Sequence, residues 1–74
     1  MDSMLTGNKL KAIRAMKGLT QMELAARAGV SPVSIATFES GRSDIKASTI
    51  VKLCDALGIT ITYRLEDGTE ITGP

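Results

Sequence analysis

Apolar residues recur at helical spacing along most of the chain, in short segments that end at glycines. Apolar positions three and four residues apart lie on one face of an α-helix. The pattern therefore predicts four short helices, over residues 8–17, 20–29, 31–40 and 47–57. The fourth has an apolar stripe made of Ile50, Leu53, Cys54 and Leu57. We expect this stripe, and Cys54 with it, to lie in the core.

The residues at the helix starts support these boundaries. Thr20 stands three positions before Glu23, the spacing of a capping box, in which each side chain accepts a hydrogen bond from the other residue's backbone N–H. Ser31 is suited to cap the third helix, and the proline after it fits the first helical position. The first helix begins at either Thr6 or Asn8, since both side chains can cap a helix.

After residue 58 the period of the pattern changes from about 3.6 residues to 2, which is typical of a β-strand with one apolar face. The apolar positions of this run are Ile59, Ile61, Tyr63 and Leu65. Residues 66–68 predict a turn, and residues 69–72 a return strand. With a three-residue loop, the predicted cross-strand pairs are Arg64 with Glu70 and Tyr63 with Ile71.

The composition excludes several classes of protein. With 43% hydrophobic and 23% charged residues, the chain is typical of a folded domain. It contains no histidine and one cysteine, so we expect neither an imidazole-based catalytic triad nor a structural zinc site. We therefore expect no enzyme, no metal and no cofactor. The chain lacks a long apolar run and a secretory signal pattern, and its single cysteine fits the reducing cytoplasm.

Charge is distributed unevenly along the chain. Residues 1–46 carry seven Lys and Arg against four Asp and Glu, a net charge of +3, whereas residues 47–74 carry two against four, a net charge of −2. An anionic partner would therefore meet the first part of the chain rather than the second.

The segment from Leu10 to Ile59 resembles the Cro/repressor-type helix-turn-helix family of bacterial and phage transcriptional regulators. The matching motifs are Leu10-x-x-x-Arg14, Gly18-Leu19-Thr20-Gln21-x-Glu23-Leu24-Ala25-x-x-Ala28-Gly29-Val30-Ser31, Ile35-x-x-x-Glu39-x-Gly41-Arg42 and Leu53-x-x-Ala56-Leu57-Gly58-Ile59. The resemblance implies a mainly α fold, a lambda-repressor-like bundle of four short helices with a C-terminal β-hairpin in place of a fifth helix. Residues 1–74 would form one domain, with residues 8–58 as the DNA-binding part and residues 59–74 as the dimerising strand pair.

The resemblance also implies roles for individual residues. The third helix would enter the major groove of double-stranded DNA. The base-facing residues would be Pro32, Val33, Ser34 and Thr37. The phosphate-facing residues would be Thr20, Gln21, Ser31, Arg42 and Lys46. Arg14 and Glu39 match a family pair that joins the first helix to the end of the third, so we expect a structural ion pair there.

The base-facing residues depart from the family pattern, in which Gln, Arg, Lys or Asn often bind bases through two hydrogen bonds. Val33 and the methyl group of Thr37 could pack on thymine methyl groups, and hydroxyl groups can bond to several base edges. Such contacts discriminate less, so either specificity depends on DNA shape or part of the DNA-binding function has been lost. This helix does not define an operator sequence.

We expect a cytoplasmic regulator that acts as a homodimer on a palindromic operator by occupancy. Part of the apolar strand face should cover the helix at residues 47–57, and the rest should form the dimer interface, made of Ile59, Ile61, Tyr63 and Leu65. The alternative is a protein-binding antitoxin or antiactivator that uses this strand, or a surface with Met16 and Met22, which we expect to be partly exposed. Its protein partner would be polymerase, a toxin or another regulator; we expect no membrane contact.

Overall fold

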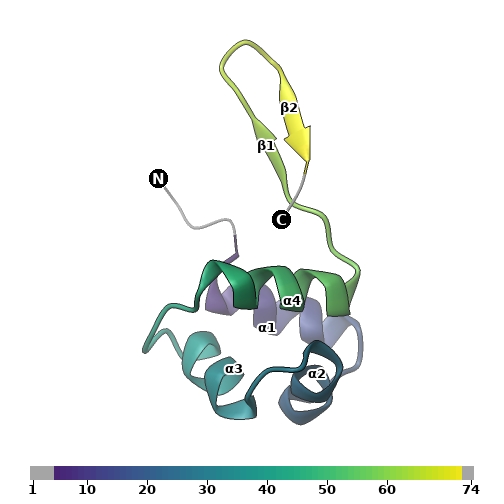
Figure 1. The fold of residues 1–74 in the computed structure, drawn as a ribbon, viewed down its shortest axis with the longest axis vertical. Helices are drawn as coiled ribbons and strands as arrows, with labels where there is room; N and C mark the ends of the chain where they lie inside the picture. Colours follow the sequence, from purple (N-terminus) through teal and green to yellow (C-terminus); the bar gives the residue numbers. More distant parts are fainter. Residues whose placement is uncertain (1–4, 73–74) are drawn as a thin grey trace.

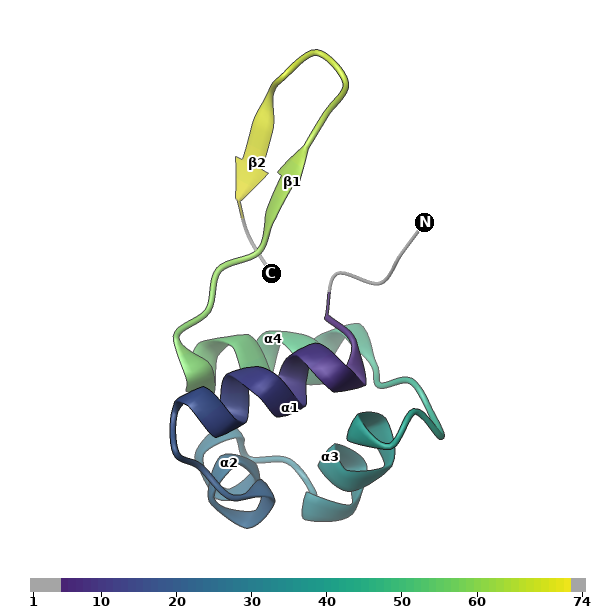
Figure 2. The same cartoon turned by 180° about the vertical axis from the view of Figure 1, so that it is seen from behind.

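The computed structural model describes residues 5–72, and its elements follow the predicted order. They are α1 (Gly7–Met16), α2 (Gln21–Ala28), α3 (Pro32–Glu39), α4 (Ala47–Leu57), β1 (Thr62–Arg64) and β2 (Glu70–Thr72). The helices pack into one body, and the antiparallel hairpin projects away from it (Figure 1, Figure 2). The predicted mainly α bundle with a C-terminal hairpin is confirmed. Residues 1–4 and the last two residues of the predicted strand pair 59–74 lie outside the described residues.

The helix starts use the predicted caps. The Thr6 side chain accepts a hydrogen bond from the Lys9 backbone N–H, so α1 begins after Thr6 rather than at Asn8. Both hydrogen bonds of the capping box between Thr20 and Glu23 are present. The glycines that follow the four helices all have positive φ angles and are Gly18, Gly29, Gly41 and Gly58. No helix formed by residues 5–72 is long and apolar enough to cross a membrane.

Aliphatic side chains and Phe38 form the core. Its buried residues are Leu5, Leu10, Leu19, Leu24, Ala25, Ile35, Phe38, Leu53 and Leu57. Cys54 is also buried, as predicted, and burial together with the nearby Asp55 raises the pKa of its thiol. A thiol in this setting is unreactive, because thiolate is the reactive form.

A glycine lets α1 approach the end of α3. A Cβ atom on Gly7 would overlap the carbonyl oxygen of Phe38 and would lie 2.9 Å from the carbonyl carbon of Phe38 and 3.0 Å from Glu39 Cα. These are backbone atoms, so they cannot rotate away. The absence of a side chain at Gly7 therefore brings α1 into contact with the part of α3 that carries Glu39.

The hairpin has the predicted register, with Arg64 opposite Glu70 and Tyr63 opposite Ile71. Part of the apolar strand face was expected to cover α4; Ile59 packs against the core that includes α4, but the hairpin itself does not cover this helix and projects from the helical body (Figure 1). The reason is that α4 already packs against α2 and has its apolar stripe buried in the core. Ile59 packs against that core, and the chain then passes beside α1, where Ile61 lines a groove with Leu5, Lys9, Ala12 and Ile13.

Candidate nucleic-acid interface

Two short helices and a tight turn form the candidate interface. At the end of α2 the backbone N–H groups of Gly29 and Val30 both bond to the Ala25 carbonyl, at 2.9 and 3.1 Å. Gly29 has a φ of +70°, a conformation that glycine adopts without strain. The turn directs the chain into α3, which buries Ile35 and Phe38 against the body and leaves Pro32 and Val33 exposed at its start.

A hydrogen-bonded cluster joins α1, the start of α2 and the end of α3. Arg14 binds Glu39 through two parallel contacts, Nε to Oε2 at 2.8 Å and Nη2 to Oε1 at 2.9 Å. Its third nitrogen, Nη1, donates to the Leu19 carbonyl at 2.8 Å. Gln21 Nε2 donates to Glu39 Oε1 at 3.0 Å. One carboxylate thus fixes the relative positions of three helices.

The Glu39 carboxylate is buried but remains charged. Burial alone would raise its pKa, but the hydrogen bonds from Arg14 and Gln21 outweigh this effect and hold the pKa below the ordinary value. The same contact raises the pKa of Arg14. No buried side-chain nitrogen or oxygen among residues 5–72 lacks a hydrogen-bond partner. The buried polar atoms of the cluster therefore all have hydrogen-bond partners. The structural ion pair between Arg14 and Glu39, predicted from the family resemblance, is present.

The four expected base-facing residues differ in exposure. Pro32 is exposed and Val33 is 69% exposed, whereas Ser34 and Thr37 are half-buried. The Thr37 hydroxyl donates to the backbone of its own helix, with Val33 O at 3.0 Å and Ser34 O at 3.2 Å. Ser34 lines a surface pocket beside the loop that follows α3, with Asp44, Ile45, Lys46 and Thr49. Ser34 and Thr37 are thus less open to a ligand than Pro32 and Val33.

The expected phosphate-facing residues form two groups. Arg42 and Lys46 are exposed in the loop between α3 and α4. Thr20 Oγ1 and Ser31 Oγ accept hydrogen bonds from the backbone at the starts of α2 and α3, at 3.0 and 3.2 Å. Gln21 is half-buried, and its amide belongs to the Glu39 cluster. A glutamine next to a capping threonine resembles an ordinary surface residue in sequence, so no local pattern indicated this contact.

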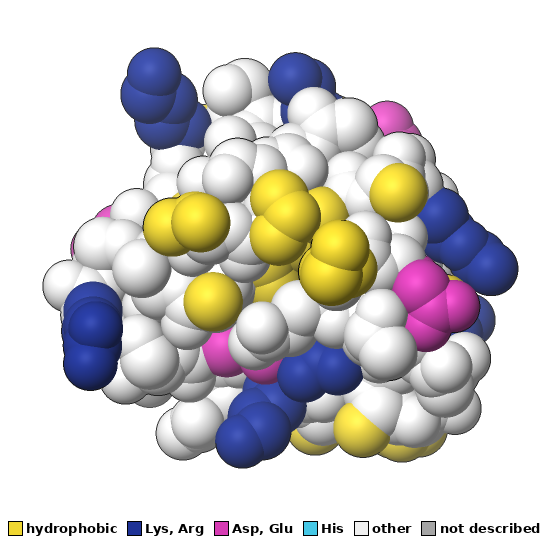
Figure 3. Space-filling view, turned by 90° about the horizontal axis from the view of Figure 1, so that it is seen from below, with side chains coloured by type: hydrophobic (Ala, Val, Ile, Leu, Met, Phe, Trp, Pro, Cys, Tyr) yellow, Lys and Arg dark blue, Asp and Glu magenta, His cyan; other side chains and the backbone are white. Residues whose placement is uncertain are grey.

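The face that contains α2 and α3 has an apolar centre and a charged edge. Figure 3 shows hydrophobic side chains gathered in the middle of this face, with Lys and Arg side chains and smaller groups of Asp and Glu side chains around it. One acidic residue, Asp44, stands in the loop between Arg42 and Lys46. Two exposed methionines also differ from expectation, because Met16 is 85% and Met22 73% exposed rather than partly covered. Both side chains lie outside the core, so they do not act as fillers.

A family model described as helix-turn-helix matches residues 10–64, three quarters of the chain and the whole of the region just described. The chain belongs to the Cro/repressor-type helix-turn-helix family. Proteins of this family are DNA-binding transcriptional regulators, and the position of α3 agrees with their recognition helix.

Three similar proteins place the chain within the family. The immunity repressor protein of Bacillus phage phi105 is 37% identical over 68 residues, which cover 92% of this chain and 47% of the repressor. Antitoxin HipB of Escherichia coli K12 is 31% identical over 55 residues, 74% of this chain and 62% of HipB. The crystal structure of the restriction-modification controller protein C.AhdI from Aeromonas hydrophila superposes with a TM-score of 0.69 at 34% identity, covering 72% of this chain and 80% of C.AhdI. The match thus spans about half the length of the phage repressor.

Proposed function

We propose that this protein is a cytoplasmic, non-enzymatic transcriptional regulator that binds a palindromic operator as a homodimer and acts by occupancy. The observation that carries the proposal is the presentation of α3: its first residues, Pro32 and Val33, are exposed, and its end is fixed to α1 and α2 through the Glu39 cluster. A rigidly held, protruding helix fits the major groove of B-DNA. Similarity to a phage immunity repressor and to a restriction-modification controller protein supports the same function.

The proposed division of contacts follows position and charge. Arg42 and Lys46 would hold the DNA backbone together with the polar groups at the start of α2 and α3, which are Thr20, Gln21 and Ser31. The α3 helix would face base edges, with Pro32 and Val33 in front and Ser34 and Thr37 behind. Phosphate contacts position a protein on DNA without reading sequence, and base contacts supply specificity.

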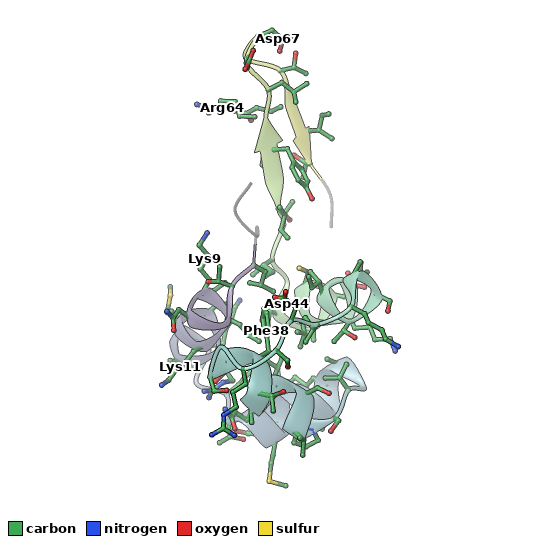
Figure 4. All side chains as sticks on the ribbon, turned by 90° about the vertical axis from the view of Figure 1, so that its left-hand side faces the viewer. Lys9, Lys11, Phe38, Asp44, Arg64 and Asp67 are labelled. Atoms are coloured by element: carbon green, nitrogen blue, oxygen red, sulfur yellow. The ribbon has the colours of Figure 1, made fainter. Side chains whose placement is uncertain are left out.

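A salt titration tests the backbone contacts. Replacing Arg42 by alanine should weaken binding to specific and random DNA almost equally and flatten the slope of log K against log[salt] by about one unit. Lys9→Ala is the matched control, because Lys9 projects from α1 on the side away from α2 and α3 (Figure 4). An unchanged slope for Arg42→Ala, or an equal effect of Lys9→Ala, would contradict this orientation on DNA. The proposal as a whole fails if the wild-type protein does not prefer its own upstream DNA to random DNA at physiological salt.

The hairpin supports the homodimer because its two faces differ. Tyr63 lies opposite Ile71, and Leu65 follows two positions along the strand, so these three share one face. Leu65 and Ile71 are 46% and 53% exposed. The other face is polar, with the Thr62 and Thr72 hydroxyls 3.3 Å apart and an ion pair between Arg64 and Glu70.

A two-stranded hairpin is at best marginally stable in water by itself. A second subunit that covers the apolar face about a two-fold axis would remove this exposed surface. We therefore propose that Ile61, Tyr63 and Leu65, extended by Ile71, form the dimer interface. Ile59 belongs to the proposed interface as its inner edge, where it packs against the helical core.

Light scattering at about micromolar concentration tests this assembly. The wild-type protein should have twice the 7.8 kDa mass of one chain. Leu65→Lys should give a monomer, because it places a charge within the apolar face. Thr62→Lys places the same charge on the polar face and should remain a dimer. A monomeric wild-type protein, or equal effects of the two substitutions, would contradict the proposed interface.

A second candidate function is a protein-binding antitoxin or antiactivator. It is favoured by the similarity to antitoxin HipB and by the exposed side chains of Met16 and Met22. Exposed, flexible methionines suit a surface that binds protein. Under this alternative, replacing Met16 and Met22 by alanine would abolish binding to the protein partner and leave DNA binding unchanged.

A further inference from the structure

The centre of the exposed face of α3 has few side-chain hydrogen-bond donors. The Thr37 hydroxyl hydrogen is bonded to the α3 backbone, at Val33 O or Ser34 O. The Ser40 hydroxyl likewise donates to the Thr37 carbonyl, at 2.8 Å. Ser34 is half-buried beside the following loop. Of these three hydroxyl groups, only that of the half-buried Ser34 is left to donate to guanine N7 and O6, which accept hydrogen bonds in the major groove.

What this face does offer is a hydrocarbon surface. Pro32 and Val33 form the exposed first turn of α3, and Val33 is 69% exposed. Thr37 lies one turn after Val33, on the same side of the helix. With its hydroxyl hydrogen engaged, Thr37 can contribute its methyl group and can accept, but not donate, a hydrogen bond. The exposed Arg42 and Lys46 in the loop that follows α3 favour a polyanion as the molecule that covers this face.

Within the major groove, one base feature matches such a surface. Thymine carries a methyl group on C5, and 5-methylcytosine carries the same group at the same place. We propose that Val33, flanked by Pro32 and the Thr37 methyl group, recognises C5-methylated pyrimidines, so that this protein reads methyl groups rather than hydrogen-bonding edges at the centre of each half-site. This inference rests on the proposed DNA-binding function and states how that function would obtain its specificity.

The methyl group can be removed from DNA without changing base pairing. A preferred site is first selected from a random DNA pool with the wild-type protein, and each thymine of that site is then replaced, one at a time, by uracil. At the contacted position the loss of one buried methyl group should weaken binding about fourfold. A site with 5-methylcytosine at that position should bind about fourfold more tightly than the same site with cytosine. The reason is that 5-methylcytosine carries the C5 methyl group of thymine but has different hydrogen-bonding groups.

Variants assign the effect to Val33. In Val33→Ala the ratio of thymine to uracil affinity at that position should fall from about four to near one. Because Val33 is exposed, this variant should fold, and circular dichroism checks that it does. Met22→Ala removes an exposed apolar side chain from α2 and should keep the full ratio. Arg42→Ala should weaken binding to both DNAs and leave their ratio unchanged, as expected for a phosphate contact.

The outcomes separate this inference from the proposed function. If a site is selected but no thymine-to-uracil exchange changes its affinity, or if Val33→Ala keeps the full ratio, the methyl-reading inference is overturned and the regulator remains. If the pool yields no sequence preferred over random DNA, the proposed function fails and the inference fails with it.

Discussion

The helical body and the hairpin each contain an arginine–glutamate ion pair, and the two pairs have the same shortest nitrogen–oxygen distance. Arg14 Nε lies 2.8 Å from Glu39 Oε2, and Arg64 Nη2 lies 2.8 Å from Glu70 Oε1. The side chains of the first pair are 15% and 3% exposed, and those of the second 76% and 50%. Water and salt screen the second pair but hardly reach the first. Burial, not distance, decides how much the protein depends on each.

The same contrast holds for the two regions as a whole. The helical body buries most of its large apolar residues within itself, and its central carboxylate is bound by two other side chains. The hairpin leaves Leu65 and Ile71 exposed on one face. The body therefore holds its core within itself, whereas the hairpin would gain further contacts from the proposed second subunit.

The largest effect is expected from Glu39. Replacing Glu39 by glutamine leaves the partly buried Arg14 charge without its counter-ion, and breaking a buried pair on one side costs about 3–5 kcal/mol of stability, which sets the upper range for this pair. Urea unfolding followed by circular dichroism measures the loss. The double variant Arg14→Met, Glu39→Leu removes both charges and should be more stable than Glu39→Gln. An unchanged urea midpoint in Glu39→Gln would show that the cluster does not hold the body together.

Substitutions at two glycines compare the helical body with the hairpin, with smaller expected losses of stability than at Glu39. Gly7→Ala places a methyl group against the Phe38 and Glu39 backbone, and overpacking of this kind costs about 1–3 kcal/mol. Gly68→Ala meets no atom within 4 Å, but Gly68 has a φ of +90°, which costs an alanine about 1–2 kcal/mol. Thermal unfolding should show a lower midpoint for Gly7→Ala. Gly68→Ala should instead act locally, as faster amide exchange in the hairpin. Loss of the same helical amide protection in both variants would contradict the separation of the two regions.

Low pH should lower the stability of the helical body by protonating the Glu39 carboxylate. Because the folded-state pKa of Glu39 is lowered, its contribution is fully present above the unfolded-state pKa, about 4.3, and is lost as the pH falls through the lower folded value. The difference in unfolding free energy between the wild-type protein and Glu39→Gln should therefore shrink below about pH 4. A difference that stays constant from pH 7 to pH 3 would contradict the charged state of Glu39.

The sequence predicted the parts of this structure that depend on local chemistry. The capping box at Thr20, the proline after Ser31 and the turn at residues 66–68 each act within a few residues, so their patterns identified the helix starts and the hairpin register. Arg14 and Glu39 are 25 positions apart in the sequence, and only the family resemblance predicted that they form an ion pair.

Features that depend on packing between elements were not predictable in this way. The hairpin was expected to cover α4, but α4 is already packed against α2, and pattern alone does not show which apolar faces are already covered. The contact from Gln21 to Glu39 has the same origin, because it exists only once α2 and α3 cross. The roles of the base-facing and phosphate-facing residues remain predictions, since they concern a molecule outside the chain.

The smallest effect is expected from Glu70. Exposed ion pairs contribute about 0.2–1 kcal/mol, and the hairpin pair should lie within that range. Glu70→Gln should lower the stability of the hairpin slightly in low salt, and the effect should disappear at about 1 M salt, where the Debye length is near 3 Å. Hydrogen exchange of the backbone amides in β1 and β2 measures the stability of the hairpin separately from that of the helical body. The substitution lies on the polar face, so the proposed dimer should persist. If Glu70→Gln instead gave a monomer, the polar face would carry the interface, and the apolar face of Leu65 and Ile71 would need another partner.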